Sequence, residues 1–190
     1  MTAEALYAVA RDATPDASVD GSFETITIDI PAESWVAVAV ALRDDATTSC
    51  RFFDWLSAYD AVERGLAVVA RLWSVERRHG AVIRTHVPRS DGVVGSLTGV
   101  FAGAAWHERE TFEMFGIGFD GHPDLRPLLL PEGFEGNPLR KEFVLASRVA
   151  KAWPGAKEPG ESDADLAGAP PRRRRARPPG VPDSGTWGVG

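Results

Sequence analysis

Apolar and polar residues alternate most regularly in the segment SFETITIDI, residues 22–30. Its three isoleucines fall on one face and its threonine and aspartate residues on the other, which predicts a strand with one buried face. Pro31 ends that strand and suits the first turn of a helix, so residues 32–45, AESWVAVAVALRDD, are predicted to be helical. A shorter helix is expected over residues 3–12, before Pro15.

The middle of the chain predicts further strands and one more helix. Two β-rich segments flank the polar turn RRHG at residues 77–80, which indicates a β-hairpin over residues 66–87. Residues 51–60, RFFDWLSAYD, are expected to form a strand that runs into a loop. Ser96 can cap a helix over residues 97–115, either continuous or broken near its middle.

These elements divide the chain into three regions. Residues 1–125 are predicted to form an α+β domain, in which a mainly antiparallel sheet is flanked by helices. Residues 126–153 follow as an extended, irregular strap that is expected to bind a partner. Residues 154–190 are rich in proline, glycine and arginine and have few large apolar side chains, so this tail is expected to be disordered when the chain is alone.

Charge and hydropathy limit the classes of function. The net charge is −6, of which residues 151–190 carry +2 and the first 150 residues −8, and an acidic body argues against general nucleic-acid binding. The longest apolar run, residues 35–42, is far shorter than the roughly 20 residues that cross a bilayer. No basic region followed by an apolar core opens the chain, so a cytoplasmic location is expected.

The residues that usually hold metals or disulfides are sparse. Cys50 is the single cysteine, which excludes an internal disulfide, a C-x-x-C motif and a cysteine-held iron–sulfur cluster within this chain. We interpret it as a small apolar residue that is buried or half-buried. The four histidines include no His-x-x-x-His pair, so no zinc site is predicted.

Residues 116–121, GIGFDG, have the spelling of a dinucleotide-binding turn. That turn needs a strand before it and a helix after it, because the pyrophosphate sits on the N-terminus of the helix. Here a helical pattern enters the turn, and Pro123 and Pro127 oppose a helix after it. We therefore interpret Gly116 as a helix stop, and a nucleotide role for these glycines is not favoured.

The segment AAWHERETFEMF carries the densest group of charged and aromatic residues. At about 100° per residue, Glu108 lies on the face of two phenylalanines, and Glu108 and Glu110 point about 160° apart. They cannot then serve one active site as an acid/base pair. A buried Glu108 needs a partner, for which Arg126 and Arg140 are favoured. The opposite face carries Trp106, Arg109, Glu110 and Glu113.

Several single residues have two interpretations. Arg109 and Glu113 have the i,i+4 spacing of a helical ion pair. Trp106 is expected in the core, with an interface anchor as the alternative. His122, in GHP, is expected to bond a turn and not to carry protons. The run Arg172–Arg175 is expected to be solvated, or else to contact an acidic partner or anionic lipid.

Between Trp106 and Phe143 the chain contains ERE, FGI, GHPDLR and PLRKEF in this order. This stretch resembles one family, the C subunits of bacterial NADH:quinone oxidoreductase, also known as the thirty-kilodalton subunits of respiratory complex I. The similarity extends over about residues 20–160, and the tail is similar to actinobacterial members. Two positions differ from the family: Glu113 stands where aspartate is usual, and Pro127 stands where a second arginine is usual.

The resemblance implies a non-catalytic subunit of the peripheral arm, at the cytoplasmic face of the cell membrane. FMN and the iron–sulfur clusters would lie on partner subunits, and this chain would carry no cofactor, metal or catalytic residue. Its partners would be other subunits of the complex, chiefly the B and D subunits, with the strap lying along the D subunit. The residues expected to build the structure or the interface are Trp106, Glu108, Arg109, Glu110, Glu113, His122, Arg126, Leu139, Arg140, Lys141 and Phe143.

Two alternatives remain at this point. The first is the equivalent subunit of a related membrane-bound hydrogenase or of a partial assembly similar to complex I, since such domains share the ERE segment. The second is a free-standing acid/base enzyme that uses His107, Glu108 and Glu110. Their divergence around a helix argues against the enzyme.

Overall fold

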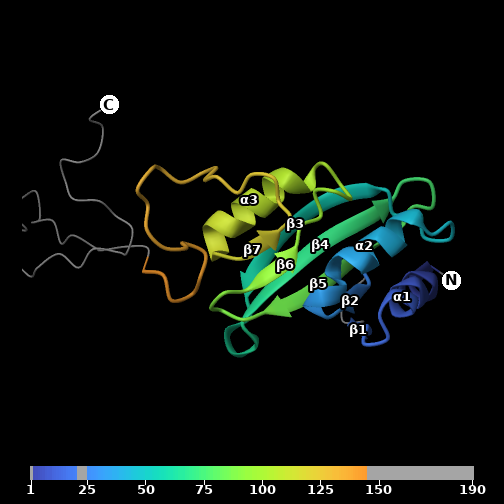
Figure 1. Cartoon of the computed structure of the whole chain (residues 1–190). Helices are drawn as coiled ribbons and strands as arrows, with labels where there is room; N and C mark the ends of the chain where they lie inside the picture. The colour runs from blue at the N-terminus through green and yellow to red at the C-terminus, as the bar shows by residue number, and fades with distance from the viewer. Residues whose placement is uncertain (1, 21–24, 145–190) are drawn as a thin grey trace, which may run out of the picture.

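The computed structural model describes residues 2–20 and 25–144. Its centre is a five-stranded sheet with the strand order β1-β2-β5-β4-β3 (Figure 1). The β2–β5 pair is parallel and the other three pairs are antiparallel. The five strands are β1 (Ser18–Asp20), β2 (Thr27–Asp29), β3 (Phe52–Asp60), β4 (Leu66–Ser74) and β5 (His79–Val87).

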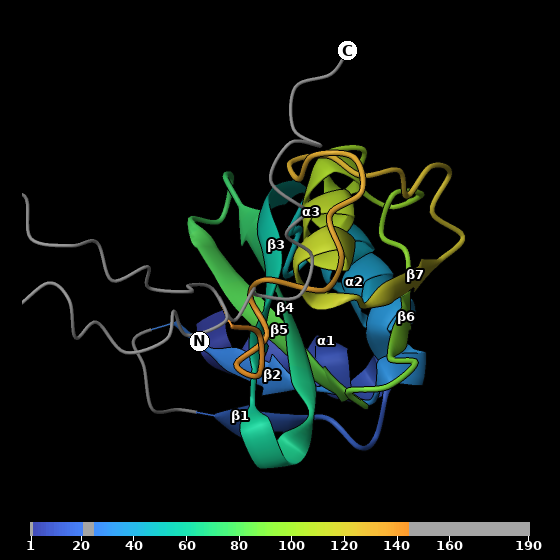
Figure 2. The same ribbon diagram turned by 90° about the vertical axis from the view of Figure 1, so that its left-hand side faces the viewer.

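The helices and a small second sheet gather on one face of the large sheet, as the two views show (Figures 1 and 2). The second sheet pairs β6 and β7 in parallel. The remaining elements are α1 (Thr2–Ala13), η1 (Ala32–Ser34), α2 (Trp35–Asp44), η2 (Val62–Arg64), β6 (Val93–Gly95), α3 (Ala104–Phe115) and β7 (Gly118–Asp120).

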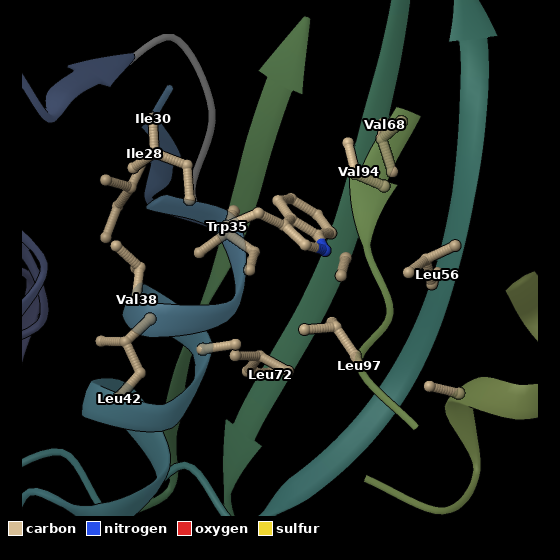
Figure 3. Packing of buried hydrophobic residues seen from close by; sticks show 14 of the residues in the cluster. Ile28, Ile30, Trp35, Val38, Leu42, Leu56, Val68, Leu72, Val94 and Leu97 are labelled. Carbon is tan, nitrogen blue, oxygen red and sulfur yellow. The ribbon is translucent and has the colours of Figure 1, made fainter. Parts of the chain in front are cut away.

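Alternation along β4 and β5 decides which face of the sheet is covered. In β5, every second residue from His79 to Val87 is buried and the residues between them are half-buried. The covered face packs against α2, where Trp35 is fully buried and points toward the sheet and Val94 (Figure 3). Cys50 is also fully buried, which confirms its interpretation as a packing residue.

The structure confirms the α+β class and the helix over residues 3–12, and it corrects three details. Residues 22–24 of the strand predicted over residues 22–30 lie outside the described residues, and within residues 25–30 the strand is β2, only Thr27–Asp29, which pairs in parallel with β5. The hairpin is confirmed, but its turn lies at residues 75–78, since His79 pairs with Ser74.

The helix predicted over residues 97–115 is wrong in its first half, because α3 begins at Ala104. Residues before it form turns, and the Ser96 hydroxyl does not cap a helix. It instead accepts the Thr98 N–H at 3.1 Å and donates to Glu108 at 2.6 Å. Gly116 ends the helix in the left-handed conformation, with φ of 68°, as the sequence predicted.

Beyond β7 the chain runs without helix or strand through residue 144. The predictions for the end of the strap and for the 154–190 tail, including Arg172–Arg175, lie outside the described residues. Within the described ranges, none of the helices combines the length and apolar character required to cross a membrane.

Candidate partner interface

Glu108 anchors the start of α3 to the turn that precedes it. Its side chain is fully buried, and its carboxylate accepts the Leu97 N–H and the Ser96 hydroxyl, each at 2.6 Å. The predicted partner, Arg126 or Arg140, is wrong. Two neutral donors take the place of the predicted cation. Since α3 begins only at Ala104, residues 96 and 97 belong to the preceding turn, and their donor groups lie next to the Glu108 carboxylate.

The environment of Glu108 favours its protonated form. Burial raises the pKa of this carboxyl group, and the hydrogen bonds from Ser96 and Leu97 oppose that rise without cancelling it. The nearest basic group is His122, whose Nε2 lies 4.0 Å from the carboxylate. The buried carboxyl group of Glu108 therefore holds the turn at residues 96 and 97 in place.

His122 has the turn-bonding role predicted from the sequence. The N–H of Asp124 donates to Nδ1 at 2.9 Å, so the proton is on Nε2, which donates to the Ala105 carbonyl at 3.1 Å. The side chain is almost completely enclosed. His122 therefore ties the chain after β7 to the first turn of α3.

Glu113 binds the strap from the last turn of α3. Its carboxylate accepts the backbone N–H groups of Leu128, Leu129 and Leu130, at 3.2, 2.7 and 2.8 Å. The predicted ion pair with Arg109 is therefore wrong. A carboxylate that accepts three backbone donors needs no side-chain cation, and the strap buries Glu113 although Trp106 and Glu110 on the same helical face stay exposed.

Arg109 holds the same part of the strap by its carbonyl groups. It donates to the carbonyls of Arg126 at 3.0 Å and Pro127 at 2.8 Å. Its guanidinium also lies 5.3 Å from the ring centroid of Trp106. Trp106 is 62% exposed, so its expected place in the core is wrong, and the alternative, an exposed anchor, fits its position.

The strap continues along the C-terminal end of α3. Leu139 N–H donates to the carbonyl of Met114 at 3.2 Å, and Nε of Arg140 donates to that of Phe115 at 2.6 Å. These bonds satisfy carbonyl groups that a helix end leaves without partners. A Cβ at Gly116 would lie 2.7 Å from Oδ1 of Asn137, so another residue there would displace the Asn137 side chain in addition to straining the positive φ. Gly116 therefore ends α3 at the place where the strap contacts the helix.

Sequence reasoning missed the last attachment point, which joins the strap to the end of β3. Asp60 has a side chain that is only 2% exposed, and it accepts the N–H of Lys141 at 2.9 Å and pairs with Arg89. Arg89 also bonds Glu142 at 2.8 Å. The Arg89 guanidinium, followed by the backbone donors, holds the pKa of Asp60 far below its usual range. Only the position of an acid at a strand end could have indicated this cluster.

The remaining predicted residues lie on the outside of this arrangement. Glu110 and Lys141 are exposed, Leu139 is 53% exposed, and Arg126 pairs with Asp124 in solvent. Phe143 stacks on Phe134, with ring centroids 5.8 Å apart. A groove of about 490 Å³ opens between α3 and the strap, and its apolar walls include Phe112, Pro127, Leu130 and Phe134.

The groups that could hold a metal, and the three residues of the acid/base alternative, can now be located. Within residues 2–20 and 25–144, no group of three or more His, Cys, Asp or Glu side chains could hold a metal. His107 packs edge-on against Phe53 and bonds the Leu56 carbonyl, while Glu108 is enclosed and Glu110 faces solvent. The structure is thus an α+β domain whose third helix binds a long irregular strap.

Comparison with known proteins places the chain in a family. Residues 28–149 match the family described as respiratory-chain NADH dehydrogenase, 30 Kd subunit. The C subunit of NADH-quinone oxidoreductase from Bordetella petrii is 36% identical over 153 residues, which cover 70% of this chain and 73% of that protein. The protein of the same name from Roseiflexus sp. is 41% identical over 142 residues, covering 72% and 81%. The chain belongs to the 30-kDa subunit family of respiratory-chain NADH dehydrogenase.

Two solved structures share the fold. One is a trypsin-resistant fragment (1-134) of Nqo5, with a TM-score of 0.52 and 22% identity, over 66% of this chain and all of that one. The other belongs to a membrane-bound sulfane sulfur reductase, an archaeal respiratory membrane complex, with a TM-score of 0.52 and 17% identity, over 68% and 77%. At these identities the likeness concerns the fold.

Proposed function

We propose that this chain is the C subunit of an NADH-quinone oxidoreductase and acts in it as a non-catalytic scaffold of the peripheral arm. Family membership supports the assignment to the complex. The scaffold role is supported by one observation: two of the three acidic residues of α3, Glu108 and Glu113, bind the chain's own backbone. Glu108 and Glu113 are closed to a substrate, which leaves the exposed Glu110 without a second acid/base group beside it.

The strap and the exposed residues of α3 form the surface that we assign to partner subunits. Trp106 is a large exposed aromatic group with an arginine stacked on it, and tryptophan and arginine dominate the binding energy of many protein interfaces. Leu129 and Leu139 extend the exposed apolar surface along the strap. Single exposed apolar residues are common, but these three lie on α3 and on the strap that Glu113 and Arg109 bind to it.

The partners follow from the proposed function. The B and D subunits of the complex are the proposed neighbours, with the strap lying along the D subunit. FMN and the iron–sulfur clusters are proposed to lie on partner subunits, and electrons to pass from NADH to quinone without using a group of this chain. The chain would reach the cytoplasmic face of the cell membrane through the complex.

The alternative of a related membrane complex is less favoured. The sulfane sulfur reductase complex shares the fold at 17% identity, whereas C subunits of NADH-quinone oxidoreductase reach 42%. The free-standing acid/base enzyme is also disfavoured, because its three residues do not face a common site. His107 bonds the Leu56 carbonyl, Glu108 is enclosed by the turn before α3, and Glu110 faces solvent.

Co-purification tests the proposed function. A tagged full-length chain, expressed in its own cells and isolated in mild detergent, should bring down the other subunits of an NADH-quinone oxidoreductase in mass spectrometry. The purified chain alone should bind neither NADH nor FMN in calorimetry. Recovery of the tagged chain with hydrogenase subunits, or micromolar binding of NADH that is lost in Gly118→Val, would contradict the proposal.

A further inference from the structure

The groove between α3 and the strap is already formed in this chain. The strap is bound to the helix on both sides of it: Glu113 accepts the N–H groups of residues 128–130, and the Leu139 N–H donates to the Met114 carbonyl at 3.2 Å. The chain between these two attachments, residues 131–136, supplies one wall of the groove. Because both ends of this wall are held, a partner does not have to order it on binding.

Phe134 is the aromatic part of that wall. Its N–H donates to the Pro131 carbonyl at 3.1 Å, which closes a turn, and its ring stacks on Phe143 with the centroids 5.8 Å apart. Phe112 of α3 and Leu130 of the strap also line the groove, and like Phe134 they are only half-buried. Around a volume of about 490 Å³, these side chains leave apolar surface that a partner can cover.

Three charged residues line the groove, and two of them already have partners. The carboxylate of Glu113 accepts three backbone N–H groups of the strap. Arg126 pairs with Asp124, with 2.7 Å between Nη2 and Oδ2. Glu132 has no ion pair or hydrogen bond within residues 2–20 and 25–144. The uncompensated charge of the lining is therefore negative.

A second acid adds to this negative rim. Glu135 is exposed, follows the lining residue Phe134, and has no partner in the part of the chain that the structure describes. The exposed Lys141 is not a lining residue, and its backbone N–H is bound to Asp60 at the end of β3. A partner segment that carries lysine or arginine would compensate the charges of Glu132 and Glu135.

The lining favours a protein side chain over other ligands. A small molecule needs polar groups that fix its orientation, but the Glu113 carboxylate is occupied and Nδ2 of Asn137 donates to the Glu113 carbonyl at 3.0 Å. Phosphate groups of nucleic acid or lipid would be repelled by the acids of the rim. Beside the groove, Arg109 bonds the carbonyl of the lining residue Pro127 and lies against the exposed Trp106. The groove thus continues the surface assigned to partner subunits.

We propose that this groove receives an aromatic side chain of a partner subunit, with a lysine or arginine next to it in the partner's sequence. The proposal rests on the proposed function and names the chemistry of the partner at this part of the surface. The aromatic ring packs against Phe112 and Phe134 in edge-to-face or offset contacts, and the cation pairs with Glu132 or Glu135. An aromatic anchor in a preformed pocket is typical of interface hot spots.

Photochemical cross-linking in the assembled complex identifies the occupant. Pro127, an exposed lining residue, is replaced by the photoreactive amino acid p-benzoylphenylalanine in the tagged full-length chain, and the complex is irradiated, purified and digested for mass spectrometry. The same amino acid in place of Glu76, in the turn between β4 and β5, is the control. Position 127 should link to a peptide of another subunit in which an aromatic residue stands next to a lysine or arginine. Position 76 should not give this product.

Charge reversal tests the rim independently of the cross-linker. Glu132→Lys should lower the recovery of partner subunits with the tagged chain about threefold or more, because the new charge repels the cation of the partner. Glu76→Lys makes the same change of charge at an exposed position that does not line the groove, and it should leave recovery unchanged. Both carboxylates are exposed, so neither variant should alter the melting temperature of the purified chain.

Several results would overturn the groove proposal. Position 127 could link to this chain itself, to a second copy of it or to lipid, or could give no link in an assembled complex, and Glu132→Lys could be recovered with its partners as well as wild type. The proposed function stands in each case if the other subunits of an NADH-quinone oxidoreductase are still recovered. If the wild-type chain recruits none of them, the proposed function fails and the groove proposal fails with it.

Discussion

The carboxylate of Glu113 accepts the backbone N–H of Leu129 at 2.7 Å, and this bond joins helix α3 to the strap across 16 residues of sequence. Two neighbouring N–H groups share the same carboxylate. A charged acceptor for three backbone donors is a strong local tie, since hydrogen bonds to charged groups contribute about 1.5–3 kcal/mol each. The helix and the strap are therefore joined as one structural unit.

Glu113→Ala should release the first part of the strap. We expect faster hydrogen exchange at the amides of residues 128–130 and a loss of folding free energy on the order of 2 kcal/mol, because the three donors lose their acceptor. Glu110→Ala, an exposed change on the same helix, is the matched control and should alter neither. Unchanged exchange in Glu113→Ala would mean that other contacts hold the strap.

Glu108→Gln should make the domain less sensitive to rising pH. The folded-state pKa of Glu108 is raised above 4.5, so its stabilising protonated form is fully present below that pH and is lost as pH rises through the folded pKa. Each unit of the rise is worth about 1.4 kcal/mol. Denaturant titrations from pH 4.5 upward should show wild type losing stability relative to Glu108→Gln, whereas Glu110→Gln should follow wild type.

Asp60→Asn should have the opposite pH signature. The pKa of Asp60 is held below its usual value by Arg89, so the stabilisation is present above the unfolded pKa of about 3.9 and is lost as pH falls through the folded pKa. The variant should be less stable than wild type at neutral pH and should lose less on acidification below about pH 4. Asp54→Asn, at a more exposed ion pair, is the control. Parallel acid curves for Asp60→Asn and wild type would refute the assignment.

Trp106→Ala should separate binding from folding. Because the side chain is 62% exposed, the free energy of unfolding should change by less than about 1 kcal/mol. Recovery of partner subunits with the tagged chain should nevertheless fall. Trp35→Ala, at a fully buried tryptophan, should cost about 3–5 kcal/mol and provides the scale. A large loss of stability in Trp106→Ala would mean that this side chain packs in the core, in contradiction to its exposed position.

The pattern of apolar and polar residues predicted the fold well in segments whose structure depends on residues close together in the sequence. The hairpin over residues 66–87 and the stop at Gly116 depend on alternation and on a single backbone conformation, and both are confirmed. The start of α3 depends on a contact between residues 96 and 108, so the periodicity that suggested a longer helix could not reveal it.

The site was harder to predict because its partners are mostly backbone groups. A buried glutamate such as Glu108 suggested a cation, yet turn N–H and hydroxyl donors serve it, and no side-chain pattern encodes them. Trp106 has the apolar character of a core residue, and only the path of the helix shows that it faces outward. Asp60 and Arg89 are 29 positions apart and meet only through the pairing of β3, β4 and β5.

The central claim is that this chain supports the complex without taking part in its chemistry. The most direct test is NADH:quinone reductase turnover per assembled complex, measured on complexes purified with Glu108→Gln or Glu110→Gln in place of the wild-type chain. Neither group lies where it could act on substrate, so turnover per assembled complex should equal that of wild type, whatever the yield of assembly. Full assembly with turnover reduced about tenfold or more, equivalent to at least about 1.4 kcal/mol of lost transition-state stabilisation, would contradict the account.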